Sequence, residues 1–168
     1  MNIFFLDWDP EVCAQYHVDK HVVKMILESC QLLYTCHWTA LADGTPEYLA
    51  STPNGTGYKP THRNHPCSIW LRESLDNYLW LLRLARALVD EYHFRYGDDK
   101  VHKCEDHLDW LSMVYPAGLE SKGLTSPRLA MPDEFKRGDP VEAYRAYYIG
   151  AKQKLMQYRK RPRPSFLG

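Results

Sequence analysis

The stretch from residue 17 to residue 33 constrains the fold more than any other part of the chain, because it is apolar around most of its helical circumference. At 100° per residue, most of its polar side chains share an arc of about 80°. These are His17, His21, Lys24, Glu28 and Gln31, which we call the polar stripe. A surface helix has a wide polar face and a narrower apolar one, and here the proportions are reversed. The pattern predicts a mostly buried helix.

The polar stripe has two interpretations. As the lining of a cleft, its histidines, lysine and glutamate would have proton affinities tuned by burial and by one another. As a slim solvent-facing edge, it would hold an i,i+4 ion pair between Lys24 and Glu28. The narrow width and the density of titratable groups favour the cleft.

The first part of the chain predicts a strand, a helical stretch and a loop. Residues 3–6 suit a short strand. Asp9 followed by Pro10 fits an N-cap and first helical position, which opens a helical stretch from about 10 to 42. Residues 43–64 are rich in Gly, Pro, Thr and Asn, and such long loops often carry function.

The rest of the chain is also predominantly helical in pattern. Asn64 or His65 before Pro66 begins a second long helix that runs to about Tyr96 and stops at Gly97. Further helices are expected over about 100–114 and from Asp139-Pro140 to about 158, separated by a segment broken by Pro and Gly. The sequence therefore predicts one compact, mainly α domain over residues 1–168, with two long helices and long connecting loops.

Composition excludes several classes of protein. A hydrophobic content of 45% is too high for a disordered chain, and no apolar run approaches the roughly 18 residues of a membrane span. The first ten residues do not resemble a signal peptide. Five cysteines cannot all pair, so we expect reduced thiols and a cytoplasmic protein, in a bacterial host if phage-encoded. We expect no membrane contact and no obligate protein partner.

Net charge is zero, but its distribution is uneven. Lys and Arg number 21, as do Asp and Glu, yet residues 144–168 carry no acidic side chain. The basic C-terminal tail, residues 152–168, mixes basic and aromatic residues, which suits phosphate contact and base stacking. Arg159, Lys160 and Arg161 are its candidate DNA contacts. A helix whose basic last turn complements its dipole is the alternative.

A second set of candidate contacts surrounds the start of the second long helix. Donors converge just before that helix and suit a phosphate or carboxylate. They are Lys59, His62, Arg63, Asn64 and His65. On the helix itself, Arg72 lies on a charged face, whereas Trp70, Ser74 and Asn77 lie on the apolar side. The two polar residues there are either hydrogen-bonded in the core or lining a cleft.

The candidate residues suit two kinds of chemistry. His17 and His21, spaced i,i+4, can share a divalent transition metal, and four other side chains could complete its shell. These are Glu28, His62, His65 and His102. Alternatively no cofactor is needed, and Lys24 or the Met1 amine forms an imine while Glu28 handles protons. The ammonium of Lys24 counts against a dication beside it.

Three segments of the sequence resemble a known family. They are AQYHVDKHVVKMILESCQLL, RNHPCSIWLRESLDNYLWL followed by EYHFRYG, and DPVEAYRAYYIGAK. Together they resemble small phage-type proteins grouped with the pyrimidine-dimer DNA glycosylase/endonuclease V family. The matching positions are Asp19, Lys24, Glu28, Gln31, Asn64, His65, Pro66 and Trp70.

The resemblance implies a compact helical fold, flipping of a damaged base, and an N-terminal amine that forms an imine with the sugar while a Glu assists. Asn2 is too large for efficient methionine removal, so the amine would be that of Met1. Our first hypothesis is therefore a DNA glycosylase/AP lyase acting on damaged or modified bases, with Glu28, Lys24, His21 and Met1 as catalytic residues. His17 and Gln31 are candidate substrate or DNA contacts, and Trp70 is a stacking or wedge residue. A metal-dependent nucleotide or nucleic-acid enzyme and a non-catalytic nucleic-acid binding module are the alternatives.

Overall fold

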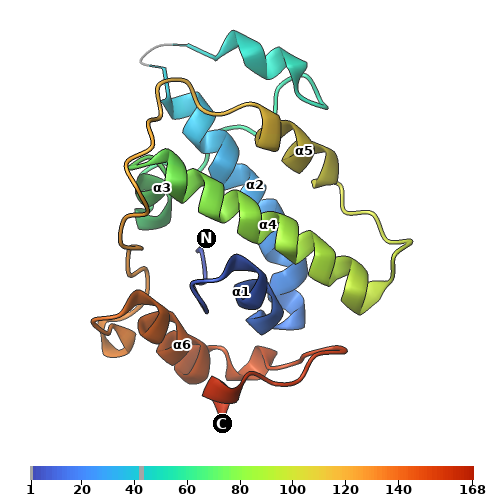
Figure 1. Ribbon diagram of the computed structural model, residues 1–168, viewed down its shortest axis with the longest axis vertical. Helices are drawn as coiled ribbons and strands as arrows, with labels where there is room; N and C mark the ends of the chain where they lie inside the picture. Colours follow the sequence, from blue (N-terminus) through green and yellow to red (C-terminus); the bar gives the residue numbers. More distant parts are fainter. Residues whose placement is uncertain (1, 42–43) are drawn as a thin grey trace.

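A computed structural model describes residues 2–41 and 44–168 (Figure 1). In these residues six α-helices follow one another along the chain. They are α1 (Pro10–Tyr16), α2 (Asp19–Thr39), α3 (Pro66–Leu71), α4 (Leu75–Tyr96), α5 (Glu105–Met113) and α6 (Pro140–Ala151). Short 3₁₀ helices cover Glu47–Ser51, Asp133–Phe135, Gln153–Leu155 and Ser165–Leu167. The mainly α fold predicted from the sequence is confirmed.

The two long helices, α2 and α4, pack against each other along the middle of the fold (Figure 1). Both contribute fully buried side chains to one hydrophobic core, such as Val22 and Ile26 of α2 and Leu81 and Leu88 of α4. Burial of each such side chain stabilises the fold by roughly 1.5–3 kcal/mol. Helix α1 packs on α4, and α5 packs against both long helices. The prediction of a mostly buried helix around residues 17–33 is confirmed.

The predicted N-terminal strand is absent. Residues 3–6 are buried, but within the described chain they pair with no other strand. Two of their backbone N–H groups donate to thiol sulfur atoms, Ile3 to Cys67 Sγ at 3.4 Å and Leu6 to Cys13 Sγ at 3.4 Å. Thiols from α3 and α1 therefore take the place of a strand partner.

The single helical stretch predicted from residue 10 to 42 is two helices with a break between them. His17 is extended, with φ −70° and ψ 136°, and its carbonyl accepts a hydrogen bond from Arg95 Nη1 at 2.8 Å. The N–H of Asp19 donates to the carbonyl of Gln157 at 2.8 Å. Distant residues thus satisfy backbone groups that a continuous helix would have used. Helix α2 ends at Thr39, and residues 42 and 43 lie outside the described residues.

The second long helix is also divided, into α3 and α4. Ser74 is extended, with φ −160° and ψ 145°, and its side chain accepts from the N–H of Asp76 as the N-cap of α4. The N-cap of α3 is His65, whose side chain accepts from the N–H of Cys67 at 3.0 Å. At its other end α4 stops where predicted, because Gly97 adopts φ 122°, a conformation that favours glycine.

The later helices are shorter than predicted. Helix α5 covers 105–113 rather than 100–114, and α6 ends at Ala151 rather than near 158. Asp139 caps α6 as expected, accepting from the N–H of Glu142. The predicted loop of residues 43–64 holds the 3₁₀ helix Glu47–Ser51 in its described part.

The segment after α6 returns to the N-terminal helices. Tyr158 Oη donates to the carbonyl of Tyr16 at 2.8 Å, and the N–H of Arg159 donates to Asp19 Oδ1 at 2.9 Å. The segment after α6 therefore lies near the start of α2 (Figure 1). No helix among the described residues is long and apolar enough to cross a membrane. All five cysteines are unpaired and buried.

Candidate active site

One pocket joins α2, α6 and the N-terminal segment. Its volume is about 190 Å³. The residues that line it are Asn2, Phe4, His21, Lys24, Met25, Glu28, Tyr147 and Lys152. Three members of the polar stripe thus face a pocket, as the cleft interpretation predicts. We call this pocket the α2–α6 pocket.

Helical spacing brings Lys24 and Glu28 together in the α2–α6 pocket. The Nζ atom of Lys24 lies 3.8 Å from Oε1 of Glu28. The lysine side chain is 67% exposed and stands at the rim, whereas the glutamate side chain is only 15% exposed. A sheltered carboxylate next to an accessible amine has the composition needed for imine chemistry with proton transfer.

His21 forms the inner wall of the same pocket. Its ring stacks on Phe4 with centroids 4.6 Å apart, and its Nδ1 lies 2.6 Å from the hydroxyl of Tyr148. Burial lowers the pKa of His21 to about 3, and the charges of His17, Lys152 and Lys24 act in the same direction. The imidazole is therefore neutral at physiological pH.

Two pocket residues from α6 and its end were not among the predicted site residues. Lys152 was assigned to the basic tail, but its ammonium lies 4.9 Å from the ring centre of Tyr147 and 5.8 Å from that of Phe4. These are cation–π distances. Helix α6 begins at Pro140, 101 positions after α2 ends at Thr39, so helical periodicity alone had no way to join them.

The remaining stripe residues do not line the pocket. His17 is fully buried, and its Nδ1 lies 2.7 Å from the carbonyl of Cys13, so it cannot make the substrate contact expected of it. Gln31 is half-buried one turn beyond Glu28. Met1, the predicted source of the N-terminal amine, lies outside the described residues, whereas Asn2 lines the pocket.

The basic loop of residues 59–65 docks on the same line of α2. The N–H of Thr61 donates to Thr35 Oγ1 at 3.1 Å, and Thr35 lies at the same helical angle as the polar stripe. At 1.5 Å per residue, Thr35 is about 10 Å beyond Glu28 along the helix axis. Lys59, Arg63 and Asn64 are exposed, and so is His62.

His62 has φ 50°, an uncommon value for a residue with a side chain, and its Nδ1 lies 2.7 Å from Thr61 Oγ1. Arg72, the residue that follows α3, holds this loop by donating to the carbonyl of Arg63 at 2.8 Å. It also donates to Ser68 Oγ at 3.0 Å. His65 caps α3 and is only half-buried. The loop therefore presents accessible donors next to the polar stripe.

Three predicted contacts on the second helix are structural. Trp70 is fully buried, and its Nε1 donates to the carbonyl of Thr125 at 3.0 Å, so it is not available as a wedge. Asn77 is also fully buried and donates to the carbonyl of Trp70 at 2.8 Å. Ser74 caps α4. The hydrogen-bonded interpretation of the two polar residues is the correct one.

The arginines of the tail are engaged within the protein. Arg161 makes an ion pair with Glu91, whose side chain is 5% exposed, through its Nη2 at 2.5 Å. Arg159 lies over the ring of Tyr96 at 4.8 Å, and Lys160 is exposed with φ 59°. Of the three predicted DNA contacts, Arg161 is therefore the least available to DNA, because its guanidinium already pairs with a buried carboxylate.

The six residues proposed as metal ligands do not come together. Within the described part of the chain, no group of three or more His, Cys, Asp or Glu side chains is placed to hold a metal ion. His21 uses Nδ1 toward Tyr148, His65 uses it to cap α3, and His102 accepts from the N–H of Cys104 at 3.1 Å. The geometry does not support the metal site as predicted.

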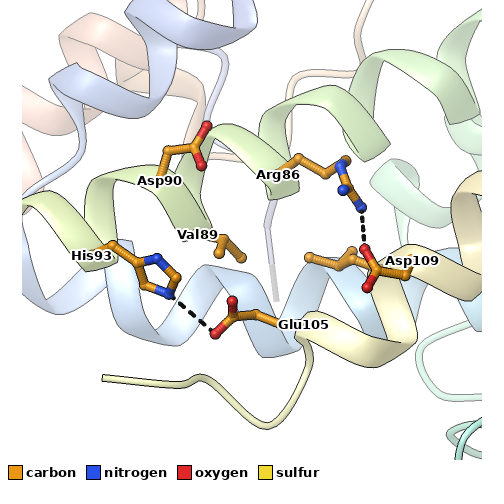
Figure 2. Close-up of a pocket in the computed structure, with 7 residues that line it drawn as sticks. Arg86, Val89, Asp90, His93, Glu105 and Asp109 are labelled. Atoms are coloured by element: carbon orange, nitrogen blue, oxygen red, sulfur yellow. Dashed lines mark hydrogen bonds and ion pairs between the residues drawn. The ribbon is translucent and has the colours of Figure 1, made fainter. Parts of the chain in front are cut away.

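A second pocket, of about 290 Å³, lies between α4 and α5 (Figure 2). Figure 2 shows two pairs across the helices, Arg86 with Asp109 at 3.1 Å and His93 with Glu105 at 3.2 Å, and Asp90 beside them. Glu105 also accepts from the N–H of His102 at 2.6 Å. Because four of its polar side chains already pair with one another, this pocket is a weaker candidate for chemistry than the α2–α6 pocket.

Comparisons with known proteins assign the family. Residues 1–104 match the sequence model of the family described as pyrimidine dimer DNA glycosylase. The match includes α1 to α4 and hence Lys24 and Glu28, whereas Tyr147 and Lys152 lie beyond it. No curated protein and no solved structure matches the chain. Because the family match covers more than half of the sequence, the chain belongs to the pyrimidine dimer DNA glycosylase family and is a DNA-acting enzyme of the glycosylase/lyase class.

Proposed function

We propose that the α2–α6 pocket is the active site of a DNA glycosylase/AP lyase acting on damaged or modified bases, in which an amine and Glu28 carry the reaction. The observation that carries the proposal is that Asn2, Lys24 and Glu28 line one pocket. The family membership favours this chemistry over a non-catalytic binding module, and among residues 2–41 and 44–168 no arrangement of side chains favours the metal-dependent alternative.

The chemistry needs one nucleophilic nitrogen and one group that moves protons. The nitrogen bonds to C1′ of the damaged nucleotide as the bond to the base breaks, and the base leaves with that electron pair and a proton that Glu28 donates. The sugar ring then opens at the C1′–O4′ bond, O4′ takes the proton that the nitrogen loses, and a protonated imine remains. Glu28 then accepts a proton from C2′, which expels the 3′ phosphate.

Two amines are the candidates for the imine. The amine of Met1 is one peptide unit from Asn2, and an α-amine with its reference pKa of about 7.7–8.0 is partly neutral at physiological pH. The amine of Lys24 is the other, held at the rim 3.8 Å from Glu28. Lys152, which also lines the pocket, supplies positive charge near a bound phosphate.

The loop of residues 59–65 supplies the DNA contacts in this proposal. Arg63 and Lys59 are exposed, and the loop docks on the same line of α2 as the pocket residues. A strand whose damaged nucleotide enters the pocket would meet these donors through phosphates on one side. Gln31 lies on α2 between Glu28 and Thr35, the residue on which the loop docks, and His62 is part of the loop.

Borohydride trapping tests the proposal. Borohydride reduces an imine to a stable amine, so a lyase becomes covalently attached to abasic or UV-irradiated DNA. We expect a trapped adduct with the wild-type chain on both DNAs, and at least tenfold less adduct with Glu28→Gln on UV-irradiated DNA, where the base must first be released. Glu142→Gln, an exposed glutamate on α6, is the matched control and is expected to trap as the wild type does. No adduct under conditions in which a control lyase is trapped would overturn the proposal.

A further inference from the structure

Tyr148 is a buried residue of α6 that contacts the wall of the α2–α6 pocket. It is fully buried on α6, and its hydroxyl lies 2.6 Å from Nδ1 of His21, a residue that lines the pocket. The contact joins α6 to α2 across 127 positions of sequence. A buried tyrosine hydroxyl needs hydrogen-bond partners, and the identity of those partners determines the direction of this bond.

The second partner of the hydroxyl is a backbone donor. The N–H of Val18 donates to Tyr148 Oη at 3.3 Å. If Nδ1 of His21 also donated to Oη, the hydroxyl hydrogen would have no acceptor, because no other acceptor bonds it among the described residues. If the hydroxyl donates to Nδ1, every group is satisfied. The second arrangement avoids the cost of a buried unsatisfied donor.

The direction of this bond fixes the tautomer of His21. When Nδ1 accepts, the neutral ring must carry its proton on Nε2. Burial, together with the positive charges nearby, lowers the pKa of His21 to about 3, so the ring stays neutral. One face of the ring stacks on Phe4 and Nδ1 is occupied by Tyr148, which leaves the Nε2 edge for the pocket. The pocket thus receives a neutral N–H donor.

We propose that Tyr148 is a positioning residue: its hydroxyl holds His21 in the tautomer that presents Nε2–H to an oxygen of the bound nucleotide. The inference rests on the proposed function of the α2–α6 pocket. A neutral donor stabilises negative charge that develops on a substrate oxygen without itself losing a proton. Tyr148 and Lys152 would then give α6 two distinct contributions to a site whose carboxylate comes from α2.

Nitrogen-15 NMR of the free protein tests the tautomer without reference to activity. We expect the His21 ring to show a protonated Nε2 and an unprotonated Nδ1 in the wild type between pH 5 and 7. His21→Gln identifies the signals. In Tyr148→Phe, the pure Nε2-protonated pattern should be lost. A wild-type ring protonated on Nδ1, or an unchanged pattern in Tyr148→Phe, overturns the inference.

Single-turnover kinetics test the functional part. Tyr148→Phe should lower the rate constant roughly tenfold while the dissociation constant for damaged DNA changes less than about twofold. His21→Gln, which keeps a donor, should retain more activity than His21→Leu. The matched control is Tyr144→Phe, another buried tyrosine of α6 whose hydroxyl donates to the carbonyl of Arg128 instead.

Equal rates for Tyr148→Phe and Tyr144→Phe, or equal rates for His21→Gln and His21→Leu, would overturn the inference. The comparison of the two His21 variants still decides if Tyr148→Phe fails to fold. The failure of the proposed function is distinct, because it would appear as the absence of a borohydride adduct, or as an adduct on UV-irradiated DNA that does not depend on Glu28, whatever the tautomer of His21.

Discussion

The α2–α6 pocket and the C-terminal tail are both rich in charge, and the structure uses these charges differently. In the pocket, Lys24 is 67% exposed and lies 3.8 Å from Glu28, so both groups remain accessible to a ligand. In the tail, Arg161 pairs at 2.5 Å with a glutamate that is 5% exposed. The comparison teaches that a run of basic residues is evidence for DNA binding only when internal carboxylates do not already engage it.

The network beneath the tail explains its structural role. Arg95 has no exposed side-chain surface, and it donates to Glu91 at 2.9 Å and to Asp19 at 3.0 Å. It also donates to the carbonyls of His17 and Gln15 at 2.8 and 2.9 Å. Arg161 completes the network from the tail by pairing with the same glutamate. These contacts stabilise the break between α1 and α2, and thereby set where the polar stripe begins.

The largest expected effect belongs to the pocket. Glu28→Gln should lower the rate of base release by about 10²- to 10⁴-fold, the range typical for loss of a general acid or base, with little change in the thermal midpoint. Single-turnover cleavage of UV-irradiated DNA and thermal unfolding measure the two quantities. A loss of less than about threefold would show that the sheltered carboxylate is not the catalytic one.

The next effect belongs to the network under the tail. Arg95→Met should lower the free energy of unfolding by about 3–5 kcal/mol, because it leaves buried carboxylates without their partner. Arg83→Met, at an exposed position of the same helix, is the matched control and should change it by less than about 0.5 kcal/mol. Denaturant unfolding measures both. Equal stability of the two variants would contradict the role given to the network.

Acid should destabilise the fold by protonating buried histidines in and next to α2. Burial lowers the pKa of His17 and of His37 to about 4, and of His21 to about 3. Because the unfolded chain binds these protons near pH 6.5 and the folded chain does not, stability should fall as pH drops from about 6.5 toward 4. Each group contributes at most about 1.4 kcal/mol per pH unit. His37→Gln should make this decline shallower. Urea unfolding at several pH values measures the free energy of unfolding, and the same dependence on pH in the variant and the wild type would contradict the role given to His37.

The smallest expected effects are on DNA affinity, and they distinguish the loop of residues 59–65 from the C-terminal tail as the DNA contact. Arg63→Gln should weaken DNA binding several-fold and reduce the slope of log K against log salt by about 1, since one phosphate contact is lost. Arg161→Gln should leave that slope unchanged, because its guanidinium already pairs with Glu91. Fluorescence anisotropy at several salt concentrations measures both slopes. The reverse result would restore the tail as the DNA contact.

Local sequence patterns predicted the features that depend on neighbouring residues. The spacing of His21, Lys24 and Glu28 follows from helical periodicity, and the pocket confirms that these three side chains share a face. Asp9 and Asp139 cap helices where the sequence places them.

Local sequence patterns did not predict contacts between residues that are far apart in the sequence. Arg95 is 78 positions from the carbonyl of His17 that it holds, so the helix break was not visible in the pattern. Trp70 is buried by residues of other elements, and its place on the apolar side of a helix did not distinguish a wedge from a core side chain. Lys152 joins the pocket only because α6 packs near Phe4.

The location of the trapped imine tests the central claim most directly. After borohydride trapping on abasic DNA, digestion and mass spectrometry identify the residue that carries the sugar remnant. The α2–α6 pocket predicts an adduct on the amine of residue 1 or on Lys24, with Lys20→Met, an exposed lysine of α2 outside the pocket, trapping as the wild type does. An adduct on a lysine outside the pocket, such as Lys160, would contradict the assignment of this pocket as the active site.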